Sequence, residues 1–305
     1  MEKKITKAVS EAKKNISSFF ITTFSKDIKK LDKAVTFTPN ENWELVFCDN
    51  FDTLDLTKWK PLIPENGIRR TAYYTTDDDI LFVKNGNLVI RTKWKNGEYG
   101  EGFYTSWLES SVDIHKEFSK DGYKGFSSTF GYYEIRCKFP PAKGIWSAFW
   151  LMPDNNDTFS DNDLQNTGED GAEIDIYESP FYYSYKNAVQ SAIHCDGYDD
   201  RLKSASSSVY QISDPYNNFH TYGLLWNKDE YVFYIDGREA WRTNHLNGTS
   251  KVNEYMIMSV EVGGENNGKV PTSYKYWCGN ALKNPKNRNY DFIVDYVKVY
   301  KKKEK

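Results

Sequence analysis

From residue 43 onward, the chain is a succession of short runs of β-favouring residues separated by turn-forming residues. Two of the separators, Asn85-Gly86 and Asp236-Gly237, are dipeptides that favour tight hairpin turns. Many short strands with few helical windows predict an all-β sandwich or jelly roll rather than an α/β fold. The clearest expected strands are 44–48, 88–92, 131–139, 173–177, 189–194, 221–226, 231–235, 255–262 and 291–300.

Composition limits the classes of partner. The 305 residues include 40 basic and 43 acidic side chains, a formal net charge of -3, so no global field attracts nucleic acid. Aromatic residues make up 16% of the chain. Their rings either fill a β-rich core or stack on the apolar faces of sugars. We therefore expect an uncharged or weakly charged partner and no nucleic acid.

The first 40 residues differ from the rest of the chain. They are rich in lysine, and apolar residues such as Ile5, Val9 and Ile16 recur at roughly helical spacing. This pattern predicts a short helical leader over residues 1–40, followed by one domain over 41–305. The leader has no signal-peptide core, and no later stretch is long enough to span a bilayer. We expect it to make no membrane contact; the alternative is a basic amphipathic helix lying on a membrane.

The four cysteines are Cys48, Cys137, Cys195 and Cys278. They are widely separated, form no CxxC pair and lack the spacing of a zinc site. An even number permits disulfides, but most of these positions lie in expected strands. Buried free thiols are therefore the favoured interpretation.

The segment Glu173–Glu178 carries three carboxylates within six residues. In a strand, Glu173 and Asp175 share one face, whereas simple alternation directs Glu178 into the core beside Ile174 and Ile176. An unpaired buried carboxylate is costly. A β-bulge near Tyr177 would restore Glu178 to the face of the other two acids. The segment therefore predicts a bulged strand with three acids on one face.

Three carboxylates at close range disfavour simultaneous ionisation, so at least one pKa should rise toward that of a general acid. Retaining glycoside hydrolysis requires such a pair, one carboxylate as nucleophile and one protonated acid. Glu173 and Glu178 fit these roles, with Asp175 between them. A solvated strand face that happens to carry acids is the alternative. Metal-assisted chemistry is disfavoured because no histidine accompanies the acids within the strand.

The motif E-x-D-x-x-E resembles the active-site strand of glycoside hydrolase family 16, which contains laminarinases, lichenases, agarases and carrageenases. Other segments are similar to family sequences in the same order, and the similarity spans about residues 42–301. These segments are Phe47 to Trp59, Gly131 to Arg136, Gly144 to Pro153, Phe219 to Gly223, Trp226, Val232 to Gly237 and Val294 to Tyr300.

The resemblance implies a β-jelly roll of two curved antiparallel sheets with a concave substrate cleft and endo cleavage of a polysaccharide. It also implies that Glu173 is the nucleophile, Asp175 its assistant and Glu178 the acid/base. Trp146 and Trp150 lie where the family places sugar-stacking rings, and their spacing puts them on one strand face; we favour Trp146 as the platform. Further substrate-binding candidates are His194, Trp107 and Glu261.

The resemblance further implies a structural calcium, with Gly86, Asp295 and Asn50 at similar positions, although an amide stands where the family has an acid. Catalysis is expected to need no cofactor. The favoured substrate is a β-1,3-glucan or a mixed β-1,3/1,4-glucan, and a galactan of the same family chemistry or a non-catalytic carbohydrate-binding role is the alternative. We expect a monomer that acts outside the cell or at its surface, although no signal peptide is visible.

Overall fold

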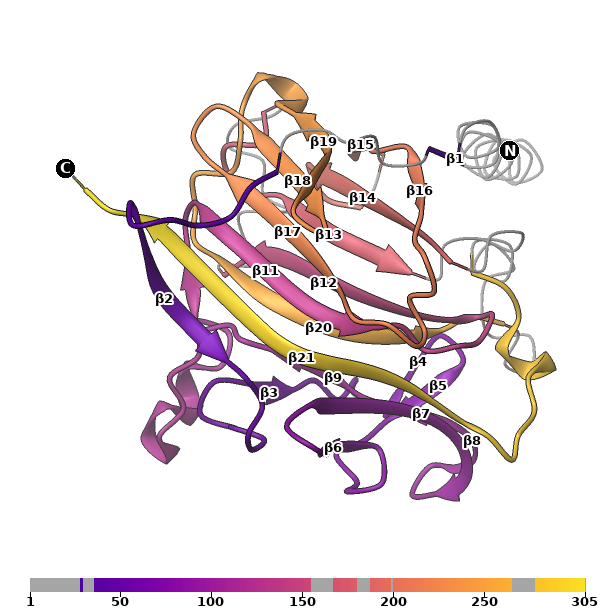
Figure 1. The fold of residues 1–305 in the computed structure, drawn as a ribbon. Helices are drawn as coiled ribbons and strands as arrows, with labels where there is room; N and C mark the ends of the chain where they lie inside the picture. Colours follow the sequence, from indigo (N-terminus) through magenta and orange to yellow (C-terminus); the bar gives the residue numbers. More distant parts are fainter. Residues whose placement is uncertain are drawn as a thin grey trace, which may run out of the picture.

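Two curved, mostly antiparallel β-sheets form the molecule in the computed structural model, which describes residues 28–29, 36–154, 167–179, 187–198, 200–264 and 278–304 (Figure 1). The described residues contain three short 3-10 helices and no longer helix. These helices are η1 (Lys116–Asp121), η2 (His245–Asn247) and η3 (Ala281–Lys283). The all-β jelly roll predicted from the strand and turn pattern is confirmed.

The first sheet has ten strands in the order β1-β16-β14-β13-β12-β20-β9-β3, with β10 added beside β20 and β15 beside β14. Its centre is the antiparallel set β14, β13, β12 and β20. The bounds are β1 (Ile28–Lys29), β3 (Lys60–Pro61), β9 (Trp107–Glu109), β10 (Ser127–Ser128), β12 (Ile145–Pro153), β13 (Glu173–Ser179), β14 (Ala188–Cys195), β15 (Lys203–Ser206), β16 (Val209–Gln211) and β20 (Glu254–Val262).

The second sheet has eleven strands in the order β19-β18-β17-β11-β21-β7-β8-β5-β4, with β2 beside β21 and β6 beside β7. The long strand β21 runs across it (Figure 1). The bounds are β2 (Trp43–Asp49), β4 (Ile68–Arg69), β5 (Ala72–Tyr74), β6 (Leu81–Val83), β7 (Leu88–Gly97), β8 (Gly100–Thr105), β11 (Gly131–Lys138), β17 (His220–Trp226), β18 (Tyr231–Ile235), β19 (Arg238–Thr243) and β21 (Asn289–Lys302).

The predicted hairpin turns are present. Asn85 and Gly86 have φ values of 53° and 69° and join β6 to β7, while Asp236 and Gly237 have 50° and 71° and join β18 to β19. Positive φ at both central residues is what a two-residue turn needs to follow the twist of its strands. All nine expected strands also occur, with ends that differ by a few residues.

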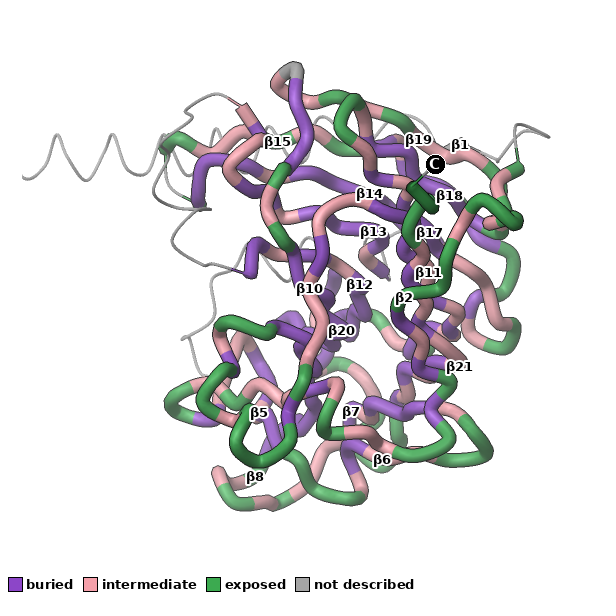
Figure 2. The backbone as a smooth tube through the Cα atoms, turned by 90° about the vertical axis from the view of Figure 1, so that its left-hand side faces the viewer, coloured by how far each residue is buried: buried purple, intermediate pink, exposed green. Residues whose placement is uncertain are grey.

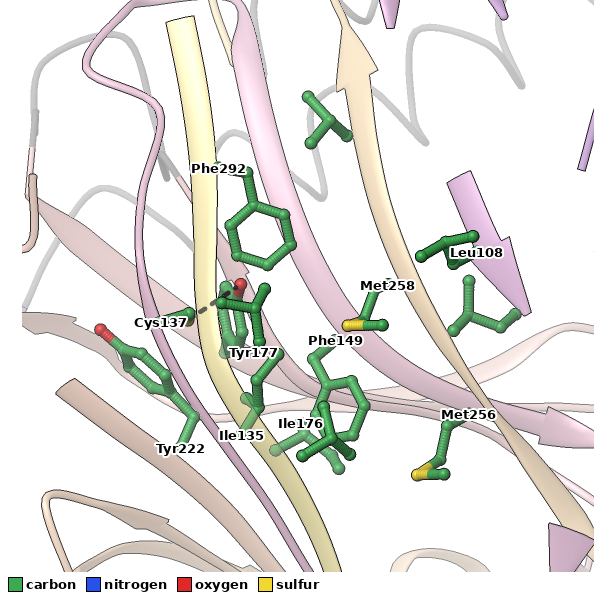
Figure 3. Packing of buried hydrophobic residues seen from close by; sticks show 14 of the residues in the cluster. Leu108, Ile135, Cys137, Phe149, Ile176, Tyr177, Tyr222, Met256, Met258 and Phe292 are labelled. Atoms are coloured by element: carbon green, nitrogen blue, oxygen red, sulfur yellow. Dashed lines mark hydrogen bonds between the residues drawn. The ribbon is translucent and has the colours of Figure 1, made fainter. Parts of the chain in front are cut away.

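The core lies between the two sheets and is rich in aromatic rings. Phe149, Tyr177 and Met258 of the first sheet meet Tyr222 and Phe292 of the second (Figure 3). The ring centroids of Tyr177 and Tyr222 are 4.5 Å apart. Buried segments run along the strands of both layers (Figure 2). Much of the aromatic excess therefore serves packing, and the positions that remain for sugar binding must be identified one by one.

Two described segments before Trp43 pair with sheet edges. Ile28 and Lys29 form β1, which pairs in parallel with β16, and Thr36 bridges to Arg238 of β19. The ring of Phe37 packs 4.6 Å from that of Tyr132. The predicted helical leader is not supported, because these segments pair with sheet edges; residues 1–27 and 30–35 lie outside the described residues. The boundary at residue 40 stays a prediction.

Two further expectations can be compared with the structure. Among the described residues, no helix is long and apolar enough to cross a membrane. All four cysteines are free thiols: Cys137, Cys195 and Cys278 are buried and Cys48 is half-buried. The interpretation of the cysteines as thiols without disulfides is confirmed. Burial raises the pKa of the Cys195 thiol to about 12, which makes it a poor nucleophile.

Candidate active site

Strand β13 contains the predicted bulge. Its register with β14 pairs Asp175 with Ala192 and Glu178 with Gln190, so that two residues, Ile176 and Tyr177, face a single position. The register with β12 shifts at the same place. The Ser191 hydroxyl donates a 2.8 Å hydrogen bond to the Ile176 carbonyl, which satisfies a backbone acceptor that the irregular ladder leaves without its usual partner.

The bulge changes which side chains face the core. Ile176 and Tyr177 are consecutive, yet both pack between the sheets (Figure 3). The Tyr177 ring lies against Phe139 and Tyr222. Glu178 thereby turns away from the core and is half-buried, with Ala148 of β12 opposite it. The strand uses one extra residue to anchor itself with two side chains and to place its last acid on the polar side.

All eight residues predicted for catalysis and sugar binding lie on the face of the first sheet that points away from the second, here called the outer face. Directly paired residues share a face, and alternate residues along a strand do as well. The registers pair Trp146 with Glu261, Trp150 with Asp175, and Glu173 with His194. Trp107 is paired with Ser259, which lies two residues before Glu261 on β20 and so shares its face; Trp107 therefore lies on the outer face as well.

The three acids share one electrostatic environment. Burial is the largest cause that raises the pKa of Glu173, of Asp175 and of Glu178. Negative charge on Asp175 raises the pKa values of both glutamates further, while His194 lowers them. Since neighbouring carboxylates cannot all ionise freely, the group retains a proton at neutral pH. It can thus present a carboxylic acid and a carboxylate side by side.

His194 extends this cluster from the neighbouring strand. Its Nε2 lies 3.4 Å from Asp175 Oδ2, and its Nδ1 lies 2.6 Å from the Ser204 hydroxyl oxygen on β15. Asp175 is only 3% exposed, so its carboxylate has little contact with water, and the nearby imidazole is a polar group that offsets part of the cost of burying it. The donor atoms of Glu173, Asp175 and His194 lie within 4.8 Å of one another. This proximity suits either shared protons or a metal ion.

Three tryptophans line the outer face. The rings of Trp107 and Trp150 make an edge contact at 5.3 Å, and the Trp150 indole N–H donates to the Ser259 hydroxyl at 3.0 Å. Trp146 is only 3% exposed, and the guanidinium of Arg70 lies 5.1 Å from its ring centroid. A sugar could stack on this face of Trp146 only if Arg70 moved. The half-buried Trp150 is the more accessible ring, and both roles remain predictions.

A pair of arginines from the second sheet reaches this face. The β4–β5 hairpin is fixed to β20 by the Thr71 N–H, which donates to the Val262 carbonyl at 3.1 Å. Arg69 Nε donates to Glu261 Oε1 at 2.6 Å, and Arg70 pairs with the other oxygen of the same carboxylate. The Arg69 guanidinium lies 4.9 Å from the ring centroid of Trp107. Glu261 is therefore an anchor for two cations rather than an isolated acid.

The sequence interpretation missed Tyr198. Its hydroxyl donates a hydrogen bond to Glu173 Oε2, although 64% of the residue is exposed. It follows β14 directly after Asp196 and Gly197, which both have positive φ. The Asp-Gly turn dipeptide after His194 was a signal that the chain reverses beside the acids. Nothing in the sequence alone indicates which acid the tyrosine meets.

The sequence that forms most of this jelly roll, strand β13 included, matches a known protein family. The sequence model of Glycosyl hydrolases family 16 matches residues 111–297, which include β13 and all three acids. The chain belongs to glycosyl hydrolases family 16. As a member of this family it is a glycoside hydrolase, and the retaining mechanism is general to the family.

Relatives and solved structures agree with membership of family 16. The beta-glucanase of Rhodothermus marinus is 25% identical over 277 residues, which cover 85% of this chain and 86% of the relative. Endo-1,3-1,4-beta-glycanase EglC of Rhizobium meliloti is 28% identical, over 83% of this chain and 51% of its own length. The crystal structure of SCLam, a non-specific endo-beta-1,3(4)-glucanase, matches with a TM-score of 0.63 at 23% identity, covering 89% of this chain and 98% of that one. The family 16 protein is thus a β-glycanase.

The calcium site implied by family 16 finds an incomplete set of donors. The Asp295 carboxylate on β21 pairs with the Arg136 guanidinium, and Asn50 Oδ1 accepts from Cys48 Sγ at 3.5 Å. Gly86 offers only its backbone in the β6–β7 turn. Calcium takes six to eight oxygen ligands, usually including free carboxylates. The side chains as arranged do not fit the ion, and the calcium site stays a prediction.

Proposed function

We propose that this family 16 enzyme cleaves a β-linked glucan within the chain by a retaining double displacement. Glu173 is the nucleophile, Glu178 the acid/base and Asp175 the assistant of Glu173. The proposal depends on one observation: the bulge at Ile176 and Tyr177 puts Glu178 on the same face as the other two acids. A regular strand would direct Glu178 into the core and leave Glu173 without a partner acid.

The two steps follow from the protonation of the cluster. In the first, a carboxylate oxygen of Glu173 attacks the anomeric carbon while Glu178 gives its proton to the departing glycosidic oxygen. In the second, Glu178 takes a proton from water, which attacks the same carbon and releases Glu173. Asp175 is buried between them and close to His194. Its negative charge opposes ionisation of Glu173, and this repulsion ends when Glu173 loses its charge on esterification.

Residues around the acids complete the proposed site. Trp150, Trp146 and Trp107 supply aromatic surface for the apolar faces of sugar rings. His194 and Glu261, with its two arginines, supply polar groups for hydroxyls. No cofactor takes part in this chemistry. The partner is a polysaccharide or oligosaccharide, and a polymer substrate of this kind supports action outside the cell or at its surface.

The favoured substrate is a β-1,3-glucan or a mixed β-1,3/1,4-glucan. The relative from Niallia circulans, 24% identical over 84% of this chain, is a glucan endo-1,3-beta-glucosidase, and EglC is an endo-1,3-1,4-beta-glycanase. These names support a glucan because the matches extend over most of the chain. They do not fix the linkage, since the loops around a shared strand decide which sugars fit.

A β-galactan is the second candidate. Relatives with similar coverage include the keratan-sulfate endo-1,4-beta-galactosidase of Sphingobacterium multivorum and the kappa-carrageenase of Pseudoalteromonas carrageenovora, each 26% identical. The specific observation in its favour is the arginine pair at Glu261, because guanidinium groups beside the acids suit a substituted or anionic sugar. A non-catalytic carbohydrate-binding role is disfavoured by the retained acids.

The test is a substrate panel with two active-site variants. Laminarin, lichenan, galactan, agarose, carrageenan and mucin glycans are incubated with the enzyme, and the released oligosaccharides are sized. Glu173→Ala and Glu178→Ala should each lower turnover by roughly 10²-fold to 10⁴-fold or more without loss of fold. Azide should restore activity to Glu173→Ala and give a glycosyl azide of inverted configuration. Wild-type turnover in either variant would remove the assignment.

A further inference from the structure

Tyr198 occupies an unusual position for an exposed tyrosine. Its hydroxyl donates to Glu173 Oε2 and lies 3.9 Å from Met152 Sδ, so it lies beside two side chains of the outer face. The turn at Asp196 and Gly197 delivers it there. A ring that is 64% exposed gains little from burial. The hydrogen bond to the carboxylate therefore contributes to holding the ring at this position.

We infer that Tyr198 is a positioning residue for catalysis, whose hydroxyl holds one oxygen of the Glu173 carboxylate and stabilises its negative charge. The inference depends on the proposed role of Glu173 as nucleophile. An ionised carboxylate accepts a stronger hydrogen bond than an ester does. The tyrosine thus favours the free carboxylate over the glycosyl-enzyme.

This preference acts differently on the two chemical steps. In the first step, one Glu173 oxygen forms the bond to the anomeric carbon, and the glycosidic oxygen leaves with the proton of Glu178. The phenol keeps its proton, but its hydrogen bond weakens as the charge on Glu173 is lost. In the second step, water forms the new bond, the ester bond breaks, and the returning charge is stabilised again. Tyr198 accordingly speeds the release of the sugar from Glu173.

The same contact affects the titration of Glu173, which several other groups also influence. Loss of the hydroxyl removes a donor to the charged form, so the nucleophile should protonate at higher pH. A substitution at position 198 leaves the other groups in place. These groups are Asp175 and Glu178 on β13, His194 on β14, Arg69 on β4 and Tyr255 on β20.

The test is Tyr198→Phe, which removes the hydroxyl and keeps the ring. With a dinitrophenyl glycoside of the oligosaccharide that the wild type releases, kcat should fall roughly tenfold to a hundredfold, the effect of one charge-assisted hydrogen bond. At the pH optimum, kcat/KM should be retained, because it reports the first step. A burst of about one dinitrophenol per enzyme should appear, and the acidic limb of kcat/KM should move up by about one to two pH units.

The matched control is Tyr290→Phe on β21 of the second sheet. It removes a tyrosine hydroxyl that donates to the Pro285 carbonyl at 2.8 Å. It should leave kcat, the burst and the pH profile unchanged. The inference is overturned if Tyr198→Phe shows wild-type kcat without a burst, or if kcat and kcat/KM fall together. In both cases an inactive Glu173→Ala shows that the proposed function stands. Wild-type turnover in Glu173→Ala would instead overturn both.

Discussion

Glu254, on β20, allows a quantitative prediction of pH-dependent stability. Its side chain is fully buried, Oε1 accepts from the Ala172 N–H at 3.2 Å, and the Ser250 side chain and the Ala172 N–H lower the pKa of the carboxyl by less than burial raises it. Burial raises its pKa from 4.5 to about 8. In the unfolded chain the carboxyl ionises near the ordinary value, whereas the folded protein keeps it protonated up to about pH 8.

The direction of the effect follows from proton binding. Between pH 4.5 and about 8 the folded state binds the proton and the unfolded state does not, so the free energy of unfolding falls as pH rises. A difference of about 3.5 pKa units corresponds to about 5 kcal/mol in total. The contribution is fully present below pH 4.5 and is lost by about pH 8. Because glutamine never ionises, Glu254→Gln should lose this dependence while keeping an acceptor for Ala172.

The assay is urea unfolding of wild type and Glu254→Gln at pH 4.5, 6 and 8. All other titrating groups are common to both proteins, so their effects cancel in the difference. The free energy of unfolding of the variant should rise relative to that of the wild type as pH rises, by about 4 kcal/mol between pH 4.5 and pH 8, because each state is half titrated at one of these two pH values. Stability curves that stay parallel to within about 1 kcal/mol would refute the reasoning, because they would mean that Glu254 titrates alike in both states.

Two further predictions concern the bulge and the calcium site. Ser191→Ala removes the hydroxyl that donates to the Ile176 carbonyl, so the melting temperature should fall by an amount equivalent to about 1 kcal/mol and kcat should fall as well. A drop in stability without any change in kcat would contradict the link between bulge and catalysis. Addition of calcium to chelator-treated wild type should leave the melting temperature unchanged, since Asp295 is paired with Arg136. Arg136→Gln should show an increase, and a clear shift in the wild type would show that the ion displaces the arginine.

The acid cluster could be predicted from six residues, Glu173–Glu178, because regular strand alternation there conflicts with the cost of burying a carboxylate. Alternation placed Glu178 in the core, an unpaired acid is costly there, and a bulge is the local device that removes the conflict. The bulge at Ile176 and Tyr177 confirms this reasoning. The helical leader failed for a related reason. Apolar spacing in a short segment does not reveal that a sheet edge is available to pair with Ile28 and Lys29.

Long-range contacts decided how the predicted sugar-binding residues are used. The sequence places Trp146 on the correct face, but it gives no sign that Arg70, 76 positions earlier, covers its ring. The pairing of Glu261 with both arginines is likewise invisible, because it depends on how the β4–β5 hairpin docks on β20. These contacts join residues that only the closure of two sheets brings together.

The sequence by itself determined the fold class, the hairpin turns and the bulged strand with its three acids, because each follows from periodicity and turn chemistry within a few residues. Only the tertiary structure decided what surrounds those acids. The imidazole of His194, the hydroxyl of Tyr198 and the arginine pair come from other strands and turns. Their distances from Glu173 depend on sheet register and loop closure, which are properties of the whole fold rather than of any segment.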